Sequence, residues 1–305
     1  MYYPILRGRQ FELIAIRELV EHNLLNDEKV IPIVEPVKLS ATYLKTLKVF
    51  KEKEQSIAIV QNPEVGTFRK DLENDKYHSL LEELQEINNK NEIPVWYLTK
   101  DFVEGGADYV NEKSLLICNE RRYLENLDKL NKEGFLGSFL VPDKKEYFRK
   151  LEEYKKIICE DYFDKKDRNS DYLEDPDQTF SEDYLYFRGD GYLGFSDYSI
   201  IGSKYNESGF APFAVAIHII YKGINNELRV KHFVSDTNDD IRDPAKKFSE
   251  AAKKLKEWNK KEKLDSLGLR LLVKAYDEQR YPGLGVVKKL TLMHHLELMS
   301  NLSYS

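Results

Sequence analysis

The chain has little cysteine and no long apolar run. Its 305 residues include two cysteines, Cys118 and Cys159, and neither has a CxxC partner. Both lie late in apolar runs, so we expect buried free thiols in a reducing cytoplasm and no zinc site. No apolar run approaches the roughly 20 residues that cross a bilayer, so we expect no contact with a membrane.

The charge balance restricts the kind of partner. The net charge is -6 at pH 7, with 33% charged and 41% hydrophobic residues. The hydrophobic share is enough for a sizeable core, and the acidic balance argues against a broad nucleic-acid surface. We therefore expect a globular protein that does not bind nucleic acid directly.

Seven short apolar runs alternate with longer stretches of helical period. The runs are nearly continuous, which is typical of strands buried on both faces of a parallel sheet. They occupy residues 2–6, 30–34, 56–60, 93–98, 114–118, 137–141 and 156–159. An unbroken series of this kind favours an α/β fold of the (β/α)₈ TIM-barrel type. No GxGxxG follows the first run, which counts against a dinucleotide-binding open sheet.

The pattern changes after Asp161. Residues 162–191 are largely polar and acidic, so we expect a surface loop or lid inserted in a single barrel-like domain of residues 1–305. Runs at 213–221 and 228–234 flank KGINNE and predict an antiparallel hairpin added to, or completing, the barrel. Helical stretches follow at 244–263, 264–280 and 284–302, the first opening with Pro244 after Asp243.

Polar side chains follow several of the apolar runs. In a parallel barrel the carboxyl ends of all strands meet at one rim, where active sites lie. Such a rim suits phosphate binding, a divalent cation such as Mg²⁺, or acid–base chemistry. The alternative is that polar residues simply begin where a buried strand meets solvent. We predict ligand-binding roles for Arg7, Asn62, Asn119, Asp161 and Asp236, and a catalytic role for Glu35.

Asp197 and His218 complete the catalytic prediction. Asp197 ends the run GFSD, and His218 lies inside AVAIHIIY. A histidine held by an aspartate is suited to proton transfer, whereas a histidine on an apolar face can equally be a satisfied core residue. Asp236 stands near Asp239 and Asp240, but this acidic cluster lacks the glycine and terminal glutamate of an EF-hand loop.

Several segments resemble a known family. They are YYPILRGRQFELIAIREL, VIPIVEPVK, IVQNPEVG, GFSDYSIIG, PFAVAIHIIY and KHFVSD. They are similar to an uncharacterised bacterial family that carries a locus-tag name and is related to the phage beta-protein family. The resemblance implies a barrel-like α/β fold and a gene lying beside one for a small restriction-endonuclease-like protein, often near mobile elements or phage-defence genes. It implies no activity and no catalytic residues.

Three functions follow as hypotheses. The first is a component of a phage-defence or mobile-element-associated two-gene module that binds a ligand or a nuclease-like partner at the rim. The second is a metal-dependent phosphodiester or nucleotide hydrolase. Arg7-Gly8 after the first run resembles glycerophosphodiesterases, although Leu6 stands where those enzymes have histidine. The third is a barrel that binds a sugar or nucleotide without turnover.

Overall fold

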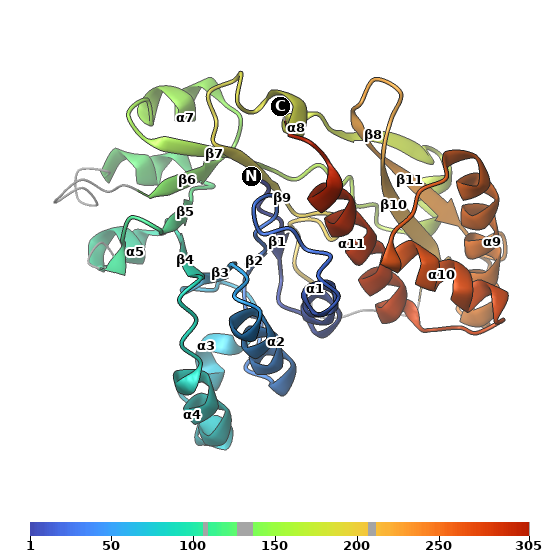
Figure 1. Cartoon of the computed structure of the whole chain (residues 1–305), viewed down its shortest axis with the longest axis horizontal. Coiled ribbons are helices and arrows are strands. Elements are labelled where there is room, and N and C mark those ends of the chain that lie inside the picture. The colour runs from blue at the N-terminus through green and yellow to red at the C-terminus, as the bar shows by residue number, and fades with distance from the viewer. Residues whose placement is uncertain (106–108, 127–136, 207–211, 305) are drawn as a thin grey trace.

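In the computed structural model, eight parallel strands form a sheet that curves into a nearly closed barrel (Figure 1). The structure describes residues 1–105, 109–126, 137–206 and 212–304. The chain before β1 pairs with β9, since Tyr3 N donates to Phe195 O at 2.8 Å and Phe195 N donates to Met1 O at 3.0 Å. In order around the barrel the strands are β1 Ile5–Leu6, β2 Ile33–Val34, β3 Ile57–Val60, β4 Glu92–Tyr97, β5 Leu115–Ile117, β6 Ser138–Val141, β7 Lys155–Glu160 and β9 Gly194–Asp197. This confirms the predicted fold class, and every one of the seven apolar runs contains a strand.

The strands are apolar on both faces because each face packs against a different partner. Ile5, Ile33 and Val95 belong to a cluster inside the barrel. Leu6 and Val34, their chain neighbours, belong to the larger cluster outside it. Alternation along a strand sends successive side chains to opposite faces, so a strand with two buried faces reads as a continuous apolar run.

Helices cover the outside of the barrel. They are α1 Gln10–Glu21, α2 Ala41–Glu52, α3 Phe68–Asp71, α4 His78–Glu86, α5 Lys100–Gly105 and α7 Lys145–Lys150. The start of α2 is fixed by Ser40, whose hydroxyl accepts a hydrogen bond from Tyr43 N at 3.3 Å. Helix α1 packs against α2 on the outside of the barrel.

A second, three-stranded sheet stands beside the barrel. The predicted hairpin is formed by β10 (Ala216–Lys222) and β11 (Leu228–Val234), but it does not join the barrel. Instead β11 pairs on its other edge with β8 (Asp177–Ser181). The eighth barrel strand is β9, which comes earlier in the chain than the hairpin.

Residues 162–191 are more ordered than the surface loop that the sequence predicts. They contain a 3₁₀ turn at Asn169–Leu173, strand β8 and the short helix α8 (Asp183–Tyr186). Phe163, Tyr172 and Phe180 are buried. These three aromatic anchors are separated by charged residues and follow neither a helical nor a strand period, so the sequence pattern does not reveal them.

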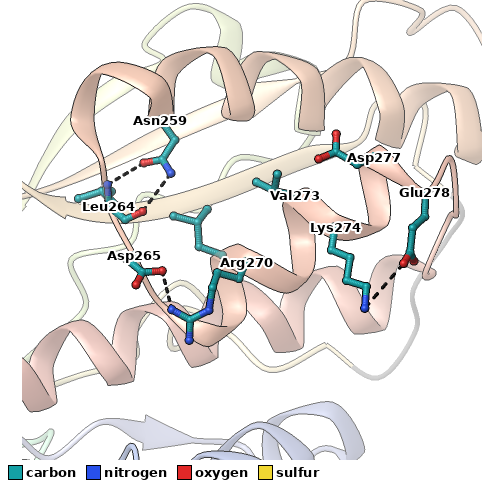
Figure 2. Close-up of a pocket in the computed structure, with 9 residues that line it drawn as sticks. Asn259, Leu264, Asp265, Arg270, Val273, Lys274, Asp277 and Glu278 are labelled. Carbon is teal, nitrogen blue, oxygen red and sulfur yellow. Dashed lines mark hydrogen bonds and ion pairs between the residues drawn. The ribbon is translucent and has the colours of Figure 1, made fainter.

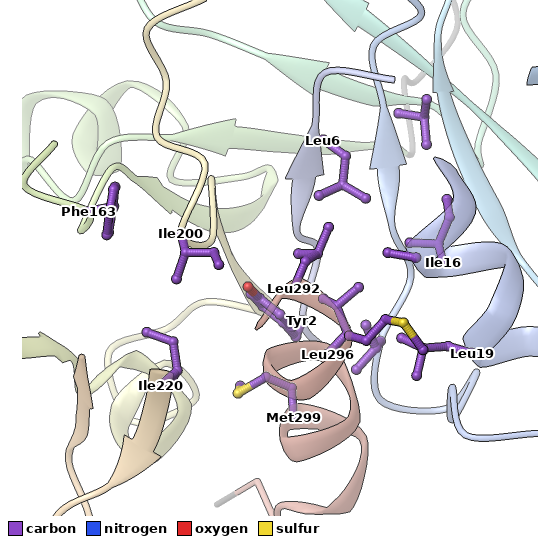
Figure 3. Close-up of a cluster of buried hydrophobic side chains, with 14 of the residues drawn as sticks. Tyr2, Leu6, Ile16, Leu19, Phe163, Ile200, Ile220, Leu292, Leu296 and Met299 are labelled. Carbon is purple, nitrogen blue, oxygen red and sulfur yellow. The ribbon is translucent and has the colours of Figure 1, made fainter. Parts of the chain in front are cut away.

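Three helices end the described chain: α9 Pro244–Glu262, α10 Leu267–Asp277 and α11 Leu284–Asn301. Helix α11 lies between the barrel and the small sheet and packs on α1 and β10 (Figures 1 and 3). His294 Nε2 donates to the carbonyl of Ile220 in β10 at 2.8 Å. The barrel exterior and the small sheet therefore share one hydrophobic core. Among the helices in the described ranges, none is long and apolar enough to cross a membrane.

The turn between β1 and α1 requires glycine. Gly8 has φ +58°, and a Cβ there would lie 2.8 Å from the carbonyl oxygen of Glu35. Gly283 has φ +88° but open space around it. Alanine at either position must adopt a left-handed backbone conformation, which costs free energy. Only at Gly8 does its Cβ also clash with a neighbouring backbone atom. We expect Gly8→Ala to lower the free energy of unfolding by about 1–3 kcal/mol more than Gly283→Ala in urea titrations. Equal losses would contradict the close approach.

Candidate functional site

The barrel mouth is closed by a buried polar cluster, here called the mouth cluster: Arg7, Glu35 and Tyr97. Glu35 follows β2 and is fully buried. Its Oε2 accepts hydrogen bonds from Arg7 Nη1 and from the Tyr97 hydroxyl, the latter at 2.8 Å. Its Oε1 accepts one from Glu64 N at 2.8 Å. Burial, and then the Glu35 carboxylate, hold the pKa of Tyr97 well above 10, so its hydroxyl stays a donor.

Two further predicted residues join this arrangement. Asn62, after β3, exchanges hydrogen bonds with the backbone of Tyr97 at 2.8 and 3.0 Å. Asp161, after β7, accepts a hydrogen bond from Ser203 N at 2.8 Å, and the carbonyl of Ser203 accepts one from Arg7. Thus four predicted rim residues, Arg7, Glu35, Asn62 and Asp161, converge as expected. Arg7 and Glu35 bond each other, Asn62 and Asp161 are joined to them through Tyr97 and Ser203, and both oxygens of Glu35 already accept hydrogen bonds.

Asp197 lies outside the barrel wall, facing α11. It is 2% exposed and its Oδ1 accepts hydrogen bonds from the Tyr2 hydroxyl at 2.7 Å and from Ser199 N at 2.6 Å. Ser199 Oγ in turn bonds His295 Nδ1 at 2.7 Å. Asp197 is therefore part of the packing between β9 and α11 and makes no contact with His218.

His218 has another histidine as its partner. It stands opposite His232 in the β10–β11 hairpin, with 2.7 Å between the two Nδ1 atoms. Burial is the main cause that lowers both pKa values, that of His218 well below 6.5 and that of His232 to about 4. Both rings are neutral at pH 7, and one Nδ1 donates to the other.

The remaining two predicted residues lie apart from the mouth cluster. Asn119 is exposed after β5, and its carbonyl accepts a hydrogen bond from the Tyr147 hydroxyl at 3.1 Å. Asp236 is exposed beyond β11, where its carboxylate bonds Lys254 of α9 at 2.6 Å.

A cavity of about 400 Å³ opens beside the mouth, between the barrel, the small sheet and α11. We call it the basic cavity. His218 lines it, as do the start of α1, the segment after β7, residues after β9 and the start of α11. Its cationic side chains are Arg9, Lys165, Lys166, Lys288 and Lys289, and its one lining carboxylate is Glu12.

The charges of the basic cavity are only partly paired. Lys166 pairs with Asp164, and Lys289 pairs with Glu18 at 2.7 Å. Arg9, Lys165 and Lys288 have no carboxylate within ion-pair distance among the described residues. Loss of hydration, followed by repulsion from neighbouring cations, lowers the pKa of both Lys165 and Lys288. Setting Glu12 against the three unpaired cations leaves a surplus of two positive charges.

Two helix N-termini meet at the same place. Arg9 precedes α1 and Gly283 precedes α11, and neither helix has a side-chain cap. The ring of Phe11 packs on Gly285 so closely that a Cβ there would lie 2.1 Å from it. In α1 the buried carboxylate of Glu12 already lies in the first turn and accepts a hydrogen bond from Arg7 N at 2.7 Å. The amides and dipole of α11 are therefore the ones that favour an added anion in this position.

A second hollow, on α9 and α10, lacks these properties (Figure 2). Asp265 bonds Arg270 at 2.5 Å, and Lys274 pairs with Glu278 at 3.7 Å. Because its charged groups neutralise one another, the basic cavity is the stronger candidate for a ligand.

Comparisons with known proteins find no match to this chain among family models, curated proteins or solved structures. The predicted relationship to the beta-protein family stays a prediction, and the site must be interpreted from its own geometry.

The sequence predicts a ligand-binding role at the rim for Arg7. Arg7 is engaged by Glu35, whereas Arg9 lines the cavity. Lys165, Lys288 and Lys289 were not predicted. They come from segments far apart in the chain, and lysines on helices and loops ordinarily face solvent.

Asp197 gives a prediction of pH dependence. Burial raises its pKa from 3.8 to about 7. A group with a raised folded-state pKa stabilises the fold below its unfolded pKa, and this contribution is lost as the pH rises towards 7. Asp197→Asn keeps an oxygen for Tyr2 and Ser199 but cannot ionise. Its free energy of unfolding, relative to the unmodified protein, should therefore rise by up to about 4 kcal/mol between pH 4 and pH 7.

Urea unfolding at half-unit pH intervals measures this difference. Asp236→Asn serves as the control, because it removes an exposed carboxylate and leaves Asp197 in place. A difference for Asp197→Asn that stays constant with pH would show that Asp197 is ionised in the folded protein throughout.

Proposed function

We propose that this protein binds a phosphate-bearing anion in the basic cavity. The observation that carries the proposal is the convergence of Arg9, Lys165 and Lys288 without carboxylate partners in the described structure. Lys165 and Lys288 are exposed at the wall of the cavity. Like charges held close together there repel one another, and a bound anion offsets that cost. The uncapped N-terminus of α11 adds backbone donors that suit phosphate oxygens.

The rest of the barrel serves this cavity as a scaffold. The mouth cluster holds the loop after β1 against the loop after β2, and this fixes the first turn of α1 with Arg9. Arg9 is also held by the carbonyl of Asn206 and lies over the Tyr205 ring, 4.7 Å from its centroid. A pre-organised cation loses little conformational entropy on binding.

The wider role remains a proposal. A barrel that binds an anionic ligand is suited to sensing within a two-gene phage-defence or mobile-element module, with the restriction-endonuclease-like protein as its partner. Co-purification of the two gene products tests that partnership separately from ligand binding.

The hydrolase alternative gains no specific support. No group of three or more His, Cys, Asp or Glu side chains in the described ranges is arranged to hold a metal ion. Both oxygens of Glu35, for which we predict a catalytic role, already accept hydrogen bonds from Arg7, Tyr97 and a backbone amide.

Lys288→Met separates binding from stability. Methionine keeps the length of the side chain and removes its charge. We expect the affinity for inorganic pyrophosphate, measured by titration calorimetry, to fall about tenfold or more, the usual effect of losing a charged hydrogen bond. The ligand-free variant should melt about 1–3 °C higher than the unmodified protein, because one uncompensated cation is gone.

Lys253→Met on the exposed face of α9 is the matched control and should change neither quantity. Unchanged pyrophosphate affinity in Lys288→Met, or no binding by the unmodified protein, would overturn the proposal.

A further inference from the structure

The basic cavity has a second, uncharged half. Besides the cations it is lined by Phe11, Phe163 and Tyr172 and by aliphatic side chains including Ile200 and Leu292. Figure 3 shows Phe163, Ile200 and Leu292 within the buried cluster that joins the barrel to α11. Phe163, Tyr172, Ile200 and Leu292 are at most 9% exposed, whereas Phe11 is 36% exposed. The Phe11 ring is therefore the apolar surface that phosphate alone leaves without a partner, and it indicates a ligand with an apolar or aromatic body.

Polar groups stand among these aromatic side chains. The His218 ring lies 5.1 Å from Phe163 and 4.7 Å from Tyr172, centroid to centroid. Its Nδ1 is engaged by His232, which leaves Nε2 available. Asn169 donates through Nδ2 to Ala214 O at 2.8 Å, which leaves its Oδ1 as an acceptor. A flat ligand group with hydrogen-bonding atoms on its edge can bond both His218 Nε2 and Asn169 Oδ1.

The Tyr172 hydroxyl adds a third polar group. It accepts a hydrogen bond from Lys166 N at 3.1 Å and keeps its own proton to donate. Lys166 is thereby placed where the aromatic side chains meet the cationic ones. One ligand can therefore reach the hydrogen-bonding edge and the unpaired cations at the same time.

Size and charge limit the ligand further. A cavity of about 400 Å³ lies near the lower end of the range for small-molecule sites and holds one small ligand. The surplus of two positive charges matches the dianion of a phosphate monoester.

We infer that the basic cavity binds a nucleoside monophosphate, with the phosphate beside the N-terminus of α11 and the base against Phe11 and His218. This inference rests on the proposed anion binding and names its ligand class. Stacking on aromatic rings tolerates any base, so the cavity selects the class of ligand before it selects the base.

Titration calorimetry with the full chain at pH 7 tests the inference. The probes are AMP, GMP, CMP and UMP, with inorganic phosphate, glucose 6-phosphate, glycerol 3-phosphate and adenosine for comparison. At least one nucleotide should bind about tenfold or more tightly than every non-nucleotide phosphate. Adenosine should bind more weakly than AMP, because it lacks the phosphate.

The outcomes separate the two proposals. If no phosphate-bearing probe binds, both fall. If inorganic phosphate or the sugar and glycerol phosphates bind as tightly as the best nucleotide, the anion site stands and the nucleotide inference is overturned.

A pair of phenylalanine variants tests the position of the base. Phe11 is 36% exposed and Phe148, on α7, is 37% exposed, so both changes to leucine should be tolerated. Phe11→Leu keeps apolar volume but removes the ring. It should weaken binding of the best nucleotide about fivefold or more, with little effect on phosphate. Phe148→Leu should leave both unchanged. Equal nucleotide affinity in the two variants would remove Phe11 from the base site.

Discussion

The buried ion pair between Arg7 and Glu35 is the constraint on which the barrel mouth depends. Removing two charges from water costs several kcal/mol for each ion, and only good geometry with additional hydrogen bonds offsets it. Glu35 obtains those bonds from Tyr97, the last residue of β4, and from Glu64 N, which follows β3. The pair therefore fixes the relative positions of the loops that follow β1, β2 and β3 and of the end of β4, and it makes the mouth a closed surface.

A closed mouth moves the ligand site outward. Because Arg7 is occupied by Glu35, the next cation along the chain, Arg9, is the one that reaches the cavity. Gly8 allows the sharp turn between them by lying against the carbonyl of Glu35. Helix α11 then brings a second N-terminus onto the first at Phe11 and Gly285. The cavity thus depends on a helix nearly 280 residues away in the chain.

Much of this architecture can be predicted from the sequence, because strands buried on both faces have continuous apolar sequences. The convergence of Glu35, Asn62 and Asp161 also follows from strand direction alone. The sequence does not predict the hydrogen-bond partner of each polar group. Nothing in the pattern shows that both oxygens of Glu35 accept hydrogen bonds, that His218 faces His232, or that Asp197 points out of the barrel. Strand β8 is not predicted from the sequence, because its residues, DQTFS, contain no apolar run.

The unpaired cations of the cavity differ from the two lysines that the fold buries. Lys156 is 5% exposed, and its Nζ donates to the carbonyls of Leu151 and Tyr154 at 2.6 and 3.0 Å. Lys247, 1% exposed, donates to the carbonyl of Asp240. Structural lysines in this protein are thus satisfied by nearby oxygens. Lys165 and Lys288 instead are exposed, line the cavity and have no ion-pair partner in the described structure. The fold satisfies the lysines that it buries, whereas these two are gathered at a cavity and are available to a ligand.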